Sequence, residues 1–119
     1  MAKYMLLIYG NEQEWASMTP EEGERLEAGH AAFAAAIGEA AVLSSHPLEP
    51  TATATTLRGD SGGRPTITDG PFLETKEALG GYYVIEASDL DQAIAMAQKL
   101  PELTWSHCAV EVRPVRDVN

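Results

Sequence analysis

The sequence has little of several features that define other classes of protein. It contains one cysteine, Cys108, which excludes an intrachain disulfide and a zinc site built from cysteines. No apolar run approaches the roughly 18 residues that span a bilayer, and the N-terminus lacks the pattern of a signal peptide. Only 8 basic residues stand against 18 acidic residues, and the net charge of −10 repels phosphate backbones. We therefore expect a cytoplasmic protein that binds neither membranes nor nucleic acid.

Familiar motifs of metal binding and catalysis are missing as well. The sequence has no HExxH, CxxC or His-x-His pattern that would hold a metal. The turn 59–63 is rich in glycine but lacks the lysine and the following helix of a phosphate-binding loop. Ser44 and Ser45 have no nucleophile-elbow context. We therefore expect no bound metal and no cofactor.

What is present has the composition of one folded domain. The chain of 119 residues is 45% apolar and 22% charged, so we expect a single domain over residues 1–119. Alternation and turn residues predict strands at 3–9, 42–48, 51–58, 66–68, 82–87 and 106–116. Helical periodicity predicts helices from 19 to about 38–40 and at 88–100, with a further helical turn at 73–79 and a polar connection at 11–18.

The two predicted helices have clear start signals. Thr19 is the expected N-cap of the first helix, because Pro20 fits the first helical position and Glu22 completes a capping box. Ser88 is the expected N-cap of the second helix. Pro101 bars that helix from continuing beyond residue 100.

The order of these elements predicts an α+β fold of the ferredoxin-like type. Without the hairpin 51–68, the order is βαββαβ. Strands 3–9 and 82–87 are apolar on both faces, as expected for the central strands of that sheet. The two helices cover only one face of the sheet, so we expect a second copy of the chain to cover the other and form a homodimer.

His30 and Asp69 are the side chains best suited to chemistry. His30 lies on the apolar face of the first helix with Leu26 and Phe33. It is either a core histidine bonded to a backbone carbonyl, the commoner case, or a proton-transfer group in an apolar pocket. Asp69 precedes Gly70, so it is either a turn former or a carboxylate held at the end of the hairpin.

Other polar and aromatic residues favour structural roles. The tyrosines of the central strands, which include Tyr9 and Tyr82, are explained by core packing, although one or two phenols could reach a ligand cavity. His46 and His107 are expected at the surface. Cys108 is expected to be an inert thiol in the core.

The stretch 69–86, Asp-Gly-Pro-Phe-Leu-Glu-Thr-Lys-Glu-Ala-Leu-Gly-Gly-Tyr-Tyr-Val-Ile-Glu, resembles the hallmark of the YCII-related (DGPF domain) family. The segments around 5–10, 30–33, 51–56 and 110–115 resemble it too, so the likeness covers nearly the whole chain. The resemblance implies a dimeric α+β barrel. It also implies a histidine–aspartate pair in a pocket, for which His30 and Asp69 are the matching residues.

Two hypotheses of function follow. The first is a small enzyme-like protein that binds an apolar or aromatic metabolite, with His30 as general acid/base and Asp69 orienting its ring. Tyr9, Phe72 and Tyr82 would line the pocket, and fold analogy suggests a cofactor-free oxygenase, isomerase or lyase. The second is a non-catalytic module that senses a ligand or binds a partner in transcription regulation, as labels attached to some relatives suggest. An open pocket at His30 and Asp69 would favour the first hypothesis.

Overall fold

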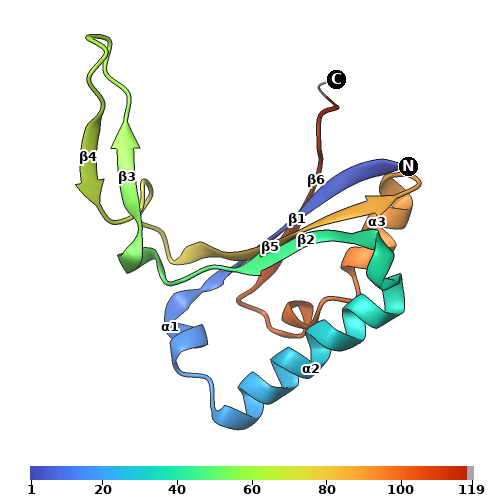
Figure 1. The fold of residues 1–119 in the computed structure, drawn as a ribbon. Helices are drawn as coiled ribbons and strands as arrows, with labels where there is room; N and C mark the ends of the chain where they lie inside the picture. The colour runs from blue at the N-terminus through green and yellow to red at the C-terminus, as the bar shows by residue number, and fades with distance from the viewer. Residues whose placement is uncertain (118–119) are drawn as a thin grey trace.

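A four-stranded antiparallel sheet forms the centre of the chain. The computed structural model describes residues 1–117. The strand order is β2-β5-β1-β6 (Figure 1). The bounds are β1 Ala2–Asn11, β2 Val42–Pro47, β5 Glu77–Ala87 and β6 Ala109–Pro114. This is the ferredoxin-like order, with the two strands that are apolar on both faces in the middle, so the predicted fold class is confirmed.

Helices cover one face of this sheet. The α-helices are α1 Glu12–Ala16, α2 Pro20–Ile37 and α3 Leu90–Ala97, and α2 runs beneath the sheet in Figure 1. Short 3₁₀ helices are η1 Glu39–Ala41, η2 Thr51–Thr53 and η3 Pro101–Thr104. The predicted capping box is present at the start of α2. Thr19 Oγ1 accepts from the Glu22 N–H at 3.2 Å, and Glu22 Oε1 accepts from the Thr19 N–H at 2.9 Å.

The hydrophobic core lies between the sheet and the helices. Leu6 from β1, Ile85 from β5 and Phe33 from α2 are its largest fully buried side chains. Burial of a side chain of this size stabilises the fold by about 1.5–3 kcal/mol. Tyr83 joins them, with its ring 4.8 Å from that of Phe33. The core therefore fixes α2, which carries His30, against β5, which carries Tyr83.

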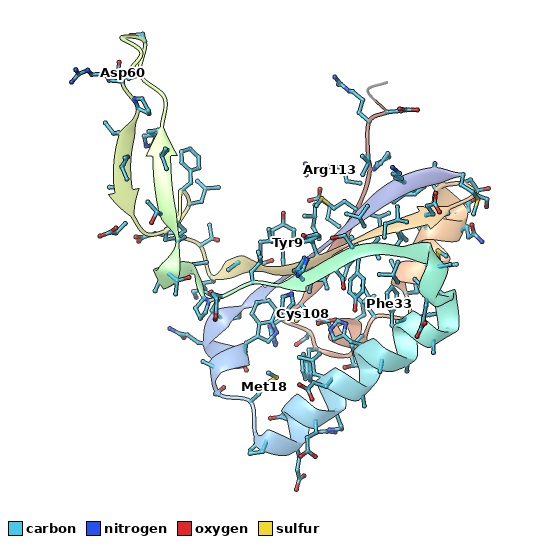
Figure 2. The ribbon with its side chains drawn as sticks, in the orientation of Figure 1. Tyr9, Met18, Phe33, Asp60, Cys108 and Arg113 are labelled. Atoms are coloured by element: carbon cyan, nitrogen blue, oxygen red, sulfur yellow. The ribbon has the colours of Figure 1, made fainter. Side chains whose placement is uncertain are left out.

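The other face of the sheet carries apolar side chains without a covering helix among residues 1–117. Met5 pairs with Val84 across β1 and β5, and both alternate with core residues. Leu7 and Tyr9 share the face of Met5. Figure 2 shows Tyr9 on the side of the sheet opposite Phe33. This face of the sheet is therefore apolar and has no covering helix in the described part of the chain.

The predicted helical turn at 73–79 is wrong. Residues 71–76 are irregular, and β5 begins at Glu77, five residues before the predicted strand. Ala78 and Glu77 pair with Gly10 and Asn11 of β1. These long-range ladder hydrogen bonds outweigh the weak local preference for a helical turn.

Other predicted boundaries shift for local reasons. Asp89, not Ser88, is the N-cap of α3, because its carboxylate accepts from the Gln92 N–H at 2.8 Å. Helix α3 ends at Ala97 rather than at residue 100. The first part of the predicted strand 51–58 is η2, and the last strand begins at Ala109. The segment predicted as a polar connection at 11–18 contains α1, capped by Asn11.

The inserted hairpin stands out from the sheet. Its strands are β3 Thr55–Arg58 and β4 Thr66–Asp69, and we call residues 55–69 the arm (Figure 1). Leu57 and Ile67 are paired across the arm, and both are well exposed, at 62% and 69%. The arm leaves the body at a hydrogen bond of 2.7 Å from the Gly70 N–H to the Ala54 carbonyl.

Candidate functional site

A cavity of about 840 Å³ opens between the α1–α2 side of the chain and the β2–β5 edge of the sheet. A volume of this size suits a small organic molecule. Its walls are mainly apolar. The residues that define its character are Ile8, Trp15, Leu26, His30, His46, Tyr82, Tyr83 and Glu102.

His30 is held by two polar partners at the wall of this cavity. Its Nε2 lies 2.6 Å from Glu102 Oε2, and its Nδ1 lies 2.7 Å from the Tyr83 hydroxyl. The His30 side chain is 27% exposed and that of Glu102 is 6% exposed. With Glu102 as a carboxylate, Nε2 carries the imidazole proton and Nδ1 accepts from the Tyr83 O–H. The three side chains then form one hydrogen-bonded chain from carboxylate to phenol.

A close approach of two backbone segments brings Glu102 to His30. Gly29 precedes His30 on α2, and Pro101 precedes Glu102 at the start of η3. A methyl group added at Gly29 would lie 2.5 Å from Pro101 Cβ, far inside contact distance. Glycine at this position therefore lets η3 pack directly on α2, which places the carboxylate opposite the imidazole.

Burial shapes the electrostatics of the site. The pKa of Tyr83 is raised, chiefly by burial and further by the negative charge of Glu102. The phenol therefore stays protonated near neutral pH and acts as a donor. Glu102 Oε1 is buried and has no hydrogen-bond partner among the described residues. The carboxylate, imidazole and hydroxyl are connected as in an acid/base triad. The site can therefore hold a proton or pass it between these three side chains.

Trp15 forms another wall of the cavity. It lies over two glycines, because a methyl group at Gly80 or Gly10 would lie 2.5 Å from its ring. Helix α1 is tied to η2 by Glu12, which accepts from the Thr51 N–H at 2.7 Å and from the Thr51 hydroxyl at 2.5 Å. These contacts fix the indole against the ends of β1 and β5.

The structure brings only part of the predicted site together. Tyr82 lines the cavity with His30, and its ring lies 5.9 Å from that of His46. Asp69 is exposed at the end of β4, paired with Thr55, and is not a partner of either His30 ring nitrogen in the described chain. The arm that carries Asp69 points away from α2 (Figure 1).

The other two predicted lining residues also lie elsewhere. Phe72 is 58% exposed, with the Arg58 guanidinium 4.6 Å from its ring centre. Tyr9 faces the side of the sheet away from the helices (Figure 2). Sequence reasoning missed Glu102, and it treated Tyr83 as core packing. Pro101 was a usable signal, since proline and acidic residues are both favoured in the first turn of a helix, and Glu102 follows Pro101 there.

Residues 1–117 contain neither a metal-binding cluster nor a membrane-spanning helix. No group of three or more histidine, cysteine, aspartate or glutamate side chains lies close enough there to hold a metal ion. None of the helices in that range is both long and apolar enough to cross a membrane.

The fold and the hydrogen-bonded side chains at His30 define a small α+β protein with a histidine at the wall of an open cavity. The chain belongs to the YCII-related family, since the model of the YCII-related domain matches residues 2–119. It is also similar to an uncharacterized protein of Rhizobium meliloti (strain 1021). The two are 38% identical over 113 residues, which cover 94% of this chain and 90% of the relative.

Proposed function

We propose that the chain binds a small apolar or aromatic metabolite in the cavity and that His30 acts there as a general acid/base. The observation that carries this proposal is His30 itself, held at the wall of an open, apolar cavity by Glu102 and Tyr83. A histidine that served packing alone would not need to face such a cavity. Within the chain, Glu102 takes the role that the resemblance gave to Asp69.

The geometry supports a simple division of labour. Glu102 orients the imidazole and stabilises its protonated form, as a carboxylate does in other acid/base triads. The Tyr83 hydroxyl oxygen lies 2.7 Å from Nδ1 of His30 and donates its hydrogen to that nitrogen. When a ligand gives a proton to the phenol oxygen, the phenol's own proton moves to Nδ1, which leaves a neutral phenol and an imidazolium held by Glu102. The apolar walls exclude water, which strengthens these interactions.

Matched histidine variants test the proposal. A set of neutral aromatic alcohols, ketones and lactones is screened by saturation-transfer NMR, and the bound compounds are then followed over time for chemical change. We expect His30→Gln and Tyr83→Phe to abolish any turnover while circular dichroism shows a folded protein. His46→Gln, which changes a second histidine of the same cavity, should retain it. No binding at all, or unchanged turnover in His30→Gln, would contradict the proposal.

The second candidate function is a ligand-sensing or partner-binding module associated with transcription regulation. The observation in its favour is the arm, which exposes Leu57 and Ile67. The same screen separates the two functions. A module of this kind would bind compounds without converting them, and His30→Gln would leave its behaviour unchanged.

We further propose a homodimer that covers the open face of the sheet. Met5, Leu7 and Val84 lie on that face, and a stable interface needs roughly 1,200 Å² in total. Light scattering should give twice the chain mass of 12.8 kDa. Val84→Glu should halve it, whereas Ala35→Glu on the exposed side of α2 should not. A folded monomer of the unaltered chain would refute the dimer.

A further inference from the structure

The wall of the cavity has charge of one sign. Four glutamates contribute to its lining, and no lysine or arginine does so among the described residues. The four are Glu12, Glu27, Glu49 and Glu102. The whole chain reinforces this bias with its net charge of −10. The potential inside the cavity is therefore negative, and apolar walls focus it rather than screen it.

The carboxylates are distributed over the depth of the cavity. Glu102 is buried at His30, and its Oε1 lacks a donor among residues 1–117. Glu27 lies one turn before His30 on α2, on the same side of the helix, and is exposed to solvent. Glu49 is exposed on the segment that follows β2. A charged group entering the cavity thus meets exposed carboxylates first and a buried one last.

An anion in this place would be disfavoured twice. It would lose its hydration on entering an apolar cavity, and the described lining offers it no lysine or arginine in exchange, while the His30 imidazole is already paired with Glu102. The raised pKa of Tyr83 points the same way, because burial, and then the charge of Glu102, already oppose a negative charge at this position. For a protonated amine, attraction inside the cavity offsets the lost hydration, because carboxylates and the face of the Trp15 indole both attract a cation.

We propose that the cavity selects a protonated amine carried on an apolar or aromatic body, and that it excludes carboxylates and phosphates of the same shape. This inference rests on the proposed function, because it assumes that the cavity is the ligand site. The carboxylates at its rim draw the ammonium group in, and the apolar walls and Trp15 take the rest of the molecule.

Three ligands of one shape test the proposal: 1-naphthylmethylamine, 1-naphthalenemethanol and 1-naphthoate. They share a ring system and differ in charge at neutral pH. Calorimetry at low salt measures affinity, and the indole N–H resonance of Trp15 reports whether the ligand occupies the cavity. We expect the amine to bind at least about tenfold more tightly than the alcohol, and the acid more weakly than both.

Matched charge variants localise the effect. Glu27→Gln should reduce the affinity for the amine and leave that for the alcohol unchanged. Glu39→Gln removes the same charge from η1, outside the cavity lining, and should change neither. An equal loss in both variants would assign the preference to overall charge and overturn the inference.

The outcomes also separate this inference from the proposed function. Binding of 1-naphthoate as tight as that of the amine, with a shifted Trp15 resonance, would refute the charge selection and leave the ligand cavity standing. No shift of the Trp15 resonance with any of the three ligands would refute the amine site and count against the cavity as a ligand site.

Discussion

Gly29→Ala is the substitution that most directly tests how the site is assembled. The added methyl group would lie 2.5 Å from Pro101 Cβ and 2.8 Å from Pro101 Cγ. Carbon atoms in contact prefer roughly 3.5–4.0 Å, so η3 has to recede from α2 by on the order of 1 Å. That movement carries Glu102 away from His30 and opens their 2.6 Å contact beyond the usual hydrogen-bond range.

Three effects determine how Gly29→Ala should change the free energy of unfolding. Alanine in place of glycine in a helix interior stabilises it by about 1 kcal/mol. Overpacking against Pro101 costs about 1–3 kcal/mol, and losing the hydrogen bond of a part-exposed histidine costs about 1–2 kcal/mol. The net expectation for Gly29→Ala is a loss of about 1–4 kcal/mol.

Gly23→Ala is the matched control. Gly23 lies in the same helix, and a methyl group there meets no atom within 4 Å, so the variant should gain up to about 1 kcal/mol. Urea unfolding at one protein concentration measures both variants, and the imidazole ¹⁵N spectrum of His30 reports the loss of Glu102 in Gly29→Ala. Equal stabilisation by the two alanines would refute the close approach of α2 and η3.

Two further predictions concern residues around the cavity. Burial, and then the charge of Glu102, raises the pKa of the Cys108 thiol to about 11. At mildly alkaline pH, iodoacetamide should therefore alkylate Cys108 roughly 100-fold more slowly in folded protein than in urea-unfolded protein. Because the unfolded thiol ionises near pH 9.0, the stability due to Cys108 should be lost as the pH rises from 9.0 through about 11. Cys108→Ala should make that decline in stability less steep. Equal alkylation rates for folded and unfolded protein would contradict the burial of the thiol. Gly80→Ala should displace the Trp15 ring, shift its fluorescence and weaken binding of 1-naphthylmethylamine. Gly59→Ala, where an added methyl group meets nothing within 4 Å, should behave as the parent chain. Unchanged fluorescence in Gly80→Ala would show that the indole does not lie over this glycine.

The fold was predictable because its signals are local. The capping box at Thr19 and the apolar character of both faces in β1 and β5 are properties of short segments, and together with the βαββαβ order of the elements they predict the ferredoxin-like sheet. Boundaries were less predictable where long-range pairing decided them. The extension of β5 back to Glu77 depends on Asn11, which is far away in the sequence.

The candidate site was predictable only in part. The helical face of α2 identified His30 as an inward-facing residue, and the structure places it at the cavity. Its partner Glu102 lies 72 residues away in a short 3₁₀ helix that has no periodic pattern of its own. The position of Asp69 depends on the direction of the arm, which no local pattern of residues 55–69 determines.

The way the arm joins the body makes it a separable insertion. Its two ends meet at the hydrogen bond between Ala54 and Gly70, so a short turn could replace residues 55–69 without moving β2 or β5. The arm can therefore be lengthened, shortened or given another sequence, and we expect the cavity to keep its shape. The same junction is a place to graft a foreign loop or a fluorescent label, because its geometry is closed before the added segment begins.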